Sequence, residues 1–250
     1  MLPKDLLKRD EFPRSNKYDA KRIIADQMGL NPLWLTEWLC QNVDLQPGMR
    51  VLDLGCGKGL SSIFLAKEYA VQVWATDLWV KASDNFMRIQ ADGLTDQVFP
   101  IHADARELPF AEEFFDSIIC IDAYIYFGTD DLYLDYLHRF VKPGGYIGIV
   151  VPGFMQALDE PLPEHMIPFW AQECWTWHTV EWWQRLWSRT GLVDVDLVEK
   201  MPNSWQFWLD WKKARVAAGD DSSSLKSDIQ VLEADQGRYM GFIRMIARRK

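Results

Sequence analysis

The sequence predicts an α/β fold, a doubly wound sheet whose strands are mostly parallel. The first indication is Val51–Ser62, where an apolar run breaks into closely spaced glycines and continues as a helix-like segment. A strand, a glycine turn and a helix in this order form the first part of a βαβ unit. The second indication is Asp77, which directly follows another strand-like run, 71–76. An acid at the end of the second strand is where a doubly wound fold holds a ribose diol.

Length and composition are consistent with a domain of this kind. The 250 residues, 48% of them hydrophobic and 25% charged, are enough for one sizeable globular core. A net charge of −9 disfavours nucleic acid as a partner. We find no signal peptide and no apolar run of 18 residues, so we expect no stable membrane insertion and a cytoplasmic location. The sequence does not indicate an oligomeric state.

The first 45 residues predict a helical preface. Helix-like pieces at 22–28 and 34–40 are separated by Asn31-Pro32, a break signal. Trp34 and Trp38 fall on one helical face, which we expect to pack on the sheet.

The next part, 46–151, alternates strands and helices. The predicted strands are 51–54, 71–76, 98–102, 117–121 and 146–151, and the predicted helices are 61–69, 81–92 and 130–140. Pro100 cannot donate a ladder hydrogen bond, which favours an edge position for its strand. Lys142-Pro143-Gly144-Gly145 predicts a sharp turn before the fifth strand.

The glycine turn indicates which nucleotide is bound. A dinucleotide fingerprint would need a third glycine at position 60, which is Leu60; here the glycines are Gly55, Gly57 and Gly59. Asp53 precedes them, and a carboxylate is unfavourable beside a pyrophosphate but favourable beside an ammonium and a sulfonium. This segment resembles the first motif of class I S-adenosylmethionine-dependent methyltransferases. The resemblance implies a Rossmann-like sheet of seven strands with an antiparallel last strand.

The resemblance also implies the cofactor, S-adenosyl-L-methionine, its product S-adenosyl-L-homocysteine, and their contacts. Asp77 would hold the ribose hydroxyls, and Asp104 would accept a hydrogen bond from the adenine amino group; taken alone, Asp104 could equally cap a turn. Tyr18 would fold over the methionine end. The expected cofactor-binding residues are Tyr18, Asp53, Gly55, Gly57, Gly59, Asp77, Leu78, Asp104, Ala105 and Ile121.

The fourth strand predicts the reaction centre. Asp122, Tyr124 and Tyr126 follow its carboxyl end, where open α/β sheets bind ligands. Asp122 is a candidate general base, and a tyrosine hydroxyl could orient an acceptor. The alternative is that Asp122 caps a turn and both tyrosines pack in the core.

From residue 152 the composition changes, and nine of the 13 tryptophans lie between 165 and 211. We predict an aromatic cap at 152–191, with 153–185 movable over the transferred methyl group. Most of these indoles should pack as core, and the rest should line a substrate pocket. His178 is a candidate base or substrate contact; a capping histidine is the alternative.

The C-terminal part, 192–250, predicts two strands and two helices. The strands, 193–198 and 239–247, match the closing antiparallel hairpin of the family. Ser204 is placed to cap the first helix, and a polar loop, 219–224, precedes a second helix at 225–234.

Together these features predict one methyltransferase domain over 1–250 that methylates a small molecule by in-line transfer and holds no metal. The alternatives are an enzyme resembling cyclopropane-lipid synthases, a non-catalytic S-adenosylmethionine-binding protein, and an NAD-dependent oxidoreductase. A three-thiol acceptor site, as in arsenite methyltransferases, is also compatible with the spacing of the four cysteines. The acceptor atom stays open among nitrogen, oxygen, sulfur and carbon.

Overall fold

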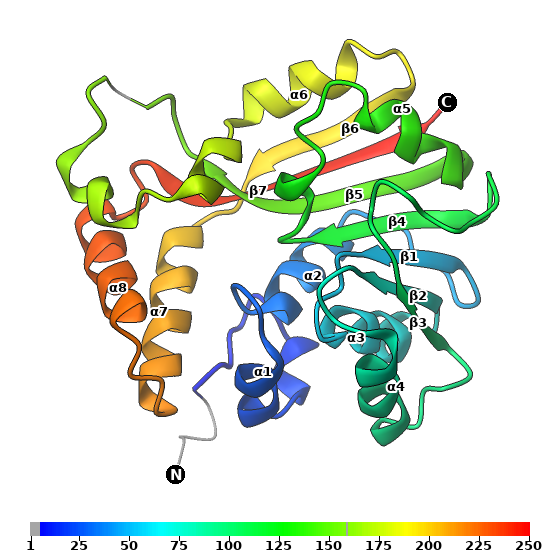
Figure 1. Cartoon of the computed structure of the whole chain (residues 1–250), viewed down its shortest axis with the longest axis horizontal. Coiled ribbons are helices and arrows are strands. Elements are labelled where there is room, and N and C mark those ends of the chain that lie inside the picture. Colours follow the sequence, from blue (N-terminus) through cyan, green and yellow to red (C-terminus); the bar gives the residue numbers. More distant parts are fainter. Residues whose placement is uncertain (1–5, 159) are drawn as a thin grey trace.

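The computed structural model describes residues 6–158 and 160–250 (Figure 1). Residues 1–5 of the predicted preface and residue 159 of the predicted cap lie outside this range.

A seven-stranded sheet forms the centre of the structure, with the order β3-β2-β1-β4-β5-β7-β6. Its strands are β1 (Arg50–Leu54), β2 (Gln72–Asp77), β3 (Val98–His102), β4 (Phe115–Ile121), β5 (Val141–Phe154), β6 (Val193–Lys200) and β7 (Met240–Arg249). Strands β1 to β5 pair in parallel, and β7 runs antiparallel to both β5 and β6. The predicted fold class is therefore confirmed, including the antiparallel last strand.

The strands form where the sequence offers residues that suit two buried faces. In β1 and β4 the side chains of Val51, Leu52, Ile118 and Ile119 are fully buried, as expected for central parallel strands with helices on both sides. Pro100 lies in β3, the edge strand, as predicted, because an edge tolerates a missing donor.

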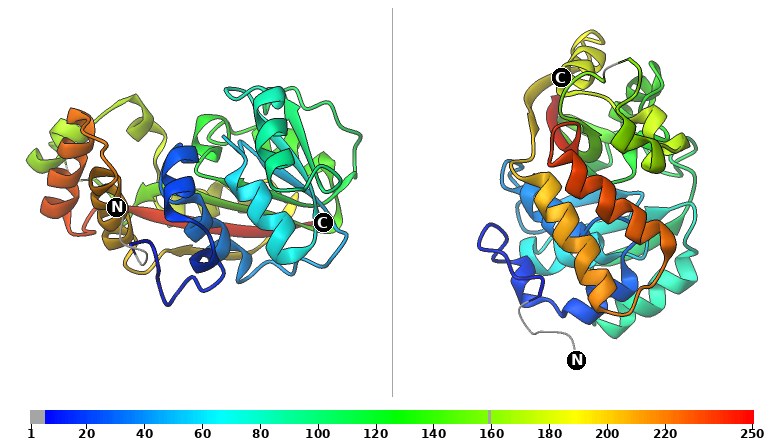
Figure 2. Two further views of the ribbon diagram at one scale, coloured as in Figure 1. Left: turned by 90° about the horizontal axis from the view of Figure 1, so that it is seen from below. Right: turned by 90° about the vertical axis from the view of Figure 1, so that its left-hand side faces the viewer.

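Helices flank the sheet (Figure 2). They are α1 (Ala20–Asp26), α2 (Pro32–Cys40), α3 (Leu60–Tyr69), α4 (Ala82–Ala91), α5 (Tyr133–Leu137), α6 (Val180–Ser188), α7 (Ser204–Ala217) and α8 (Ser223–Asp235). Short 3-10 turns are η1 (Ser15–Lys17), η2 (Tyr124–Tyr126), η3 (His138–Phe140), η4 (Glu164–Phe169) and η5 (Gln172–Thr176). Helix α2 packs on β4 and β5, whereas α6 packs on β6 and β7.

Two predicted elements differ from the structure. The sharp turn at 142–145 lies inside β5, as an irregularity in the register between β4 and β5, with Gly144 at φ +77°. The helix predicted at 130–140 is confined to the short α5 and η3. The side chain of Asp130 accepts a hydrogen bond from the Leu132 N–H (2.7 Å), a local bond that competes with helix formation.

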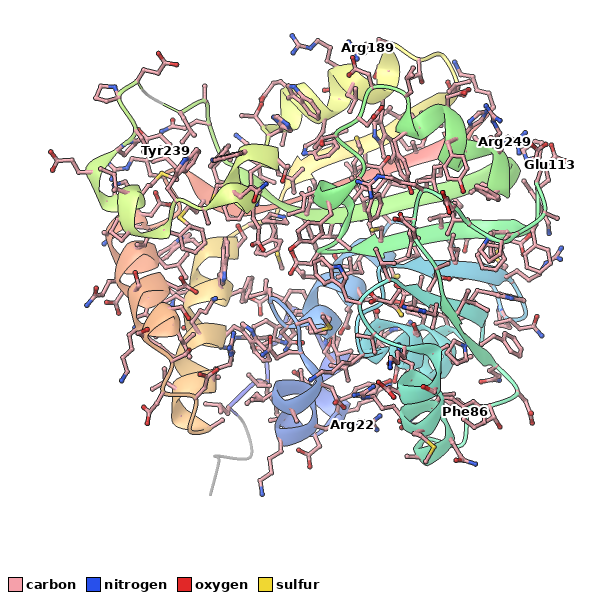
Figure 3. All side chains as sticks on the ribbon, viewed as in Figure 1. Arg22, Phe86, Glu113, Arg189, Tyr239 and Arg249 are labelled. Carbon is pink, nitrogen blue, oxygen red and sulfur yellow. The ribbon has the colours of Figure 1, made fainter. Side chains whose placement is uncertain are left out.

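Helices α7 and α8 pack against each other and lie away from α3 and α4, with α1 and α2 between them, as Figure 1 shows. The segment around η4 is tied to this pair, because His165 bonds the buried carboxylate of Asp235 at 2.9 Å. The same carboxylate accepts the N–H groups of Tyr239 and Met240 at the start of β7. Side chains at the opposite end of β7 are also paired: Arg249 contacts Glu113 at 3.0 Å (Figure 3).

Candidate functional site

A cavity of about 860 Å³ opens at the carboxyl ends of the parallel strands, a size suited to a small-molecule ligand. One part, here called the cofactor end, is lined by the glycine loop after β1 and by the ends of β2 and β3. The other part, here called the acceptor end, is lined by residues 168–177, by α7 and α8 and by Phe242. Asp122 and the loop 28–30 line the same cavity.

At the cofactor end the glycine loop takes a backbone shape that other residues resist. Gly55 and Gly57 have φ values of +74° and +53°, in the left-handed region. A Cβ added at Gly55 would overlap with the side chain of Ala123. The loop therefore presents bare backbone to the cavity, followed by the first turn of α3, whose N–H groups lack intrahelical acceptors.

Asp77 fixes this loop from the end of β2. One of its carboxylate oxygens accepts the N–H of Gly57 at 2.8 Å, and the other accepts those of Trp79 and Val80, also at 2.8 Å. An ionised carboxylate offers about four acceptor positions, so it can still receive a hydroxyl. Asp77 lines the cavity and is thus placed both to shape the loop and to meet a ligand diol.

Four other predicted cofactor contacts, Leu78, Asp104, Ala105 and Ile121, also line the cavity. Asp104 combines the two interpretations offered for it. Its carboxylate accepts the N–H of Arg106 at 2.8 Å, which caps the turn after β3, and it also faces the cavity.

Three predicted cofactor contacts are absent from the cavity wall. Asp53 is fully buried, and one of its oxygens accepts the hydroxyls of Ser61 and Ser62, each at 2.6 Å. Burial raises the pKa of Asp53 to about 6. Gly59 is the left-handed residue before α3. Both residues stabilise the start of α3. They therefore support the glycine loop without lining the cavity.

Tyr18 also lies away from the cavity. Its hydroxyl donates to Glu68 at 3.3 Å, and its ring contacts Phe64 of α3 with the centroids 5.5 Å apart. The part of the preface that does reach the cavity is Met28–Leu30, in the loop between α1 and α2. Arg22 of α1 (labelled in Figure 3) pairs with Asp92 after α4, and Lys67 of α3 pairs with the same carboxylate, so α1 is held against these two helices.

These groups fit S-adenosyl-L-methionine. The glycine loop lets a ligand lie against the main chain, Asp77 retains capacity for a ribose hydroxyl, and Asp104 can accept from an amino group. Leu78 and Ile121 add apolar surface at the same end. Carboxylates around the cavity suit a ligand that carries a sulfonium and an ammonium.

Asp122 occupies the junction between the two ends of the cavity. It follows β4 directly, its N–H donates to the Val150 carbonyl at 2.8 Å, and it has a strained φ of +57°. One carboxylate oxygen accepts the N–H of Leu30 at 3.4 Å, a long bond. Burial is the main cause that raises the pKa of Asp122 to about 7. A carboxyl that titrates near neutrality can both accept and return a proton.

The structure separates the two tyrosines that follow Asp122. Tyr126 lines the cavity, and its ring packs against Trp79 with the centroids 5.1 Å apart. Tyr124 is fully buried between Trp183 and Trp187 of α6 and does not line the cavity. The packing alternative therefore describes Tyr124, whose side chain points toward α6 because η2 turns the chain.

The walls of the acceptor end are aromatic. Trp208 of α7 lies 5.9 Å from Phe169, 5.7 Å from Trp177 and 5.0 Å from Phe242, measured between ring centroids. All four side chains line the cavity. Together they form an apolar wall at this end of the cavity, of the kind that binds an apolar or aromatic ligand.

Charged groups complete the acceptor end. Lys212 pairs with Asp228 at 2.5 Å across α7 and α8, and Arg215 pairs with Asp220 at 2.6 Å. Glu173 of η5 lines the cavity on the side of Tyr126, since η5 packs against η2. The two cations are therefore neutralised by neighbouring carboxylates.

His178 is not part of the cavity wall. Its ring stacks on Trp182 at 3.5 Å, and burial lowers its pKa to about 4. The ring is neutral at pH 7, and its place outside the wall removes it from contact with a ligand. The predicted cap is accordingly divided: η4 and η5 face the cavity, whereas α6 buries Trp183 and Trp187 in the core.

Among residues 6–158 and 160–250, no three His, Cys, Asp or Glu side chains come together as a metal site would require. The four cysteines in this range are free and buried, which gives no support to a three-thiol acceptor site. In the same range no helix is long and apolar enough to cross a bilayer.

Sequence reasoning missed the loop 28–30 and the cavity-facing residues of α7. Gly29 beside Asn31-Pro32 signals a turn but not what the turn contacts. Trp208, Lys212 and Arg215 fall at helical spacing, and this mixed aromatic and basic face was the available signal.

Residues 51–145 match the methyltransferase-domain family. Methyltransferase GfsG of Streptomyces halstedii is 32% identical over 120 residues, which is 46% of this chain and 42% of GfsG. The chain thus spans less than half the length of this curated relative.

Solved structures share the fold. Phosphoethanolamine N-methyltransferase 2 of Haemonchus contortus, in complex with S-adenosyl-L-methionine, superposes with a TM-score of 0.74 at 18% identity, over 98% of this chain and 59% of that one. The [4+2]-cyclase SpnF gives a TM-score of 0.69 at 19% identity, over 86% and 80%. The domain match assigns residues 51–145 to a methyltransferase domain, and the sheet order and the glycine loop agree with the predicted class I S-adenosylmethionine-dependent methyltransferase fold.

Proposed function

We propose that the protein, acting as one methyltransferase domain, transfers the methyl group of S-adenosyl-L-methionine to a small-molecule acceptor. The observation that supports this most strongly is the continuity of the cavity. The glycine loop and Asp77 lie at one end, four aromatic side chains lie at the other, and Asp122 stands between them. A donor and an acceptor bound in this order meet beside the carboxyl of Asp122.

The cofactor supplies an activated methyl group when bound. Asp77 and Asp104 would hold its nucleoside, and the glycine loop would position the rest of the molecule. Asp122 takes the proton that an acceptor loses, and its pKa of about 7 lets it do so at neutral pH. Tyr126 closes the wall beside it, and η4 and η5 keep water from the reacting atoms.

The acceptor has an apolar or aromatic body, because Phe169, Trp177, Trp208 and Phe242 would otherwise line water. Curated relatives with names such as sterol 24-C-methyltransferase support apolar substrates as a class. We further propose a cytoplasmic location, which the four free cysteines support, since a reducing compartment keeps thiols unpaired. Nucleic acid is not a proposed partner, in view of the net charge of −9.

The test is a transfer assay. Purified protein is incubated with methyl-labelled S-adenosyl-L-methionine and a panel of apolar amines, alcohols, thiols and phenols that share one aromatic scaffold. We expect labelled product from at least one chemical class and none with Asp122→Asn at the same pH. If the protein binds the cofactor but no panel or cell extract yields labelled product, the enzymatic proposal is wrong.

One observation favours the alternative that the chain binds S-adenosyl-L-methionine without transferring its methyl group: SpnF, which has this fold, is named as a [4+2]-cyclase. Copurification separates the two possibilities. A protein without methyl transfer would retain S-adenosyl-L-methionine unchanged, whereas a methyltransferase exposed to extract would convert it to S-adenosyl-L-homocysteine. Mass spectrometry of the denatured protein before and after exposure reports the ratio of the two compounds.

A further inference from the structure

The carboxylate of Asp122 is in contact with a loop that lies more than 90 positions earlier in the chain. Its Oδ2 accepts the Leu30 N–H at 3.4 Å. A Cβ added at Gly29 would overlap with this same oxygen, so the carboxylate rests directly against the glycine backbone. A side chain at position 29 would therefore have to displace the Asp122 carboxylate, whereas the φ of Gly29, which is not in the left-handed region, does not itself require glycine.

A third segment holds this loop. The indole N–H of Trp211, on α7, donates to the carbonyl oxygen of Gly29 at 2.8 Å. Trp211 is fully buried and meets Trp34 of α2 edge to face, with the centroids 6.2 Å apart. On the far side of the loop, Asn31 caps α2 by accepting the Leu33 N–H at 3.1 Å. The loop is therefore fixed by one partly buried hydrogen bond from α7 and by the start of α2.

We propose that Trp211 and Gly29 are positioning residues for Asp122. Trp211 holds the Gly29 carbonyl, Gly29 leaves room for one carboxylate oxygen, and Leu30 donates to that oxygen. Because Asp122 lines the cavity, its other oxygen would then be left to meet an acceptor and take its proton. The backbone of Asp122 alone cannot fix the side chain, because its bond to Val150 fixes only the N–H.

The contact with Gly29 also limits the exposure of the Asp122 carboxylate to solvent. Contact with Gly29 covers one oxygen, and burial is the main reason that the pKa of Asp122 is raised. Other charges act on it from the neighbouring elements: Glu173 on η5 raises this pKa, and Lys212 on α7 lowers it. A loop released from Trp211 would admit water and return the pKa toward the ordinary value for aspartate, about 4.

The proposal rests on the proposed function for its catalytic meaning, so the experiment has two readouts. The first is the titration of the Asp122 carboxyl, followed by carbon NMR on protein labelled at aspartate and assigned with Asp122→Asn. The second is the pH profile of kcat with any acceptor found in the panel. Both are measured for Trp211→Phe, which keeps an aromatic side chain, although a smaller one, and removes the N–H donor.

Trp34→Phe is the matched control. Trp34 is equally buried, it contacts the same cluster, and its indole N–H has no hydrogen-bond partner among the described residues. We expect Trp211→Phe to lower the titration midpoint of Asp122 by at least about one pH unit and kcat by about tenfold. Affinity for S-adenosyl-L-homocysteine should stay unchanged, and Trp34→Phe should shift neither readout.

Gly29→Ala provides a second route if Trp211→Phe does not fold. It should displace the carboxylate and move the same midpoint in a chain whose α7 cluster is intact. An unchanged midpoint in the folded Trp211→Phe variant, or equal shifts in Trp211→Phe and Trp34→Phe, would overturn the proposal. The titration result stands even if no acceptor is methylated, so failure of the proposed function is recognised separately.

Discussion

The two ends of the cavity differ in the chemical groups that line them. At the cofactor end, Asp77 accepts three backbone N–H groups, and the glycine loop offers main chain rather than side chains. At the acceptor end, aromatic rings and ion pairs from η4, η5, α7, α8 and β7 form the wall. The first end is formed by turns that all lie within residues 55–106, while the second depends on segments from residue 168 to residue 242.

This difference explains where similarity to other proteins is found. The family match covers 51–145, which includes the entire glycine loop and the ends of β2, β3 and β4. The acceptor end lies outside that range, whereas Asp122 and Tyr126 fall within it. A backbone-built site changes only with the fold, whereas a side-chain wall can be altered one residue at a time. We infer that the cofactor is a property of the family and the acceptor a property of this chain.

We expect the largest effect from a substitution at the cofactor end. Asp77→Ala removes the acceptor of three N–H groups, so the glycine loop loses its anchor. We expect binding of S-adenosyl-L-homocysteine to weaken by roughly 1.5–3 kcal/mol, measured by calorimetry. Asp96→Ala, at an exposed acid before β3, serves as the control and should bind like the wild type. If Asp77→Ala and the control bound S-adenosyl-L-homocysteine equally well, Asp77 would not be required at the cofactor end.

The second effect concerns the acceptor side. Trp208→Ala opens the aromatic wall, and we expect kcat/KM for an apolar acceptor to fall at least about tenfold, which corresponds to about 1.4 kcal/mol. Cofactor affinity should not change. Because Trp208 is almost fully buried, Trp208→Phe is measured alongside to keep a folded reference. Loss of cofactor binding in a folded variant would show that the two ends are not independent.

The third effect is a pH dependence of stability at the junction. Burial raises the pKa of Asp122 to about 7 in the fold, against about 4 in an unfolded chain. The protonated form is favoured by folding, so stability is fully present below pH 4 and is lost as the pH rises toward 7. Asp122→Asn does not titrate and should gain roughly 2 kcal/mol over the wild type between pH 4 and 8.

Thermal unfolding of both proteins at several pH values measures this difference. Asp53, whose pKa is also raised by burial, titrates in both proteins and cancels from the comparison. A constant difference in Tm across the range would mean that Asp122 is not shifted.

The fourth effect distinguishes the two parts of the predicted cap. We expect η4 and η5 to exchange backbone hydrogens faster than α6 in the free protein and to gain protection with S-adenosyl-L-homocysteine and an acceptor bound. Helix α6 should exchange slowly throughout, because Trp183 and Trp187 are fully buried. Mass spectrometry of exchanged peptides reads both. Protection of 164–177 equal to that of β1 in the free protein would remove the movable-cap prediction.

The smallest effect is expected at His178. His178→Ala loses the stack on Trp182, which should cost about 1 kcal/mol of stability. Turnover and cofactor affinity should match the wild type, since the ring lies outside the cavity wall and is neutral above its pKa of about 4. A drop in kcat without a drop in Tm would show that His178 contributes to the reaction.

The sequence predicted the sheet well because its strands are short apolar runs with marked ends, and because Pro100 marks an edge. It also indicated Asp77, Asp104 and Asp122 as cavity residues, since parallel strands deliver their carboxyl ends to one side. Asp53 was expected to contact the cofactor but lies outside the cavity wall. The alternation of side chains along a strand buried on both faces does not show which face an acid in it points to. Tyr18 and His178 were misplaced because their neighbours in space, Glu68 and Trp182, are not readable from local pattern. The contact of Gly29 with Asp122 is purely tertiary and leaves no local signal.

The central claim is that the glycine loop and Asp77 bind S-adenosyl-L-methionine rather than a dinucleotide. Calorimetric titration of the wild-type protein with S-adenosyl-L-homocysteine and, separately, with NAD tests it most directly. We expect saturable heat with one equivalent of S-adenosyl-L-homocysteine and none with NAD. Heat with NAD and none with S-adenosyl-L-homocysteine would contradict it.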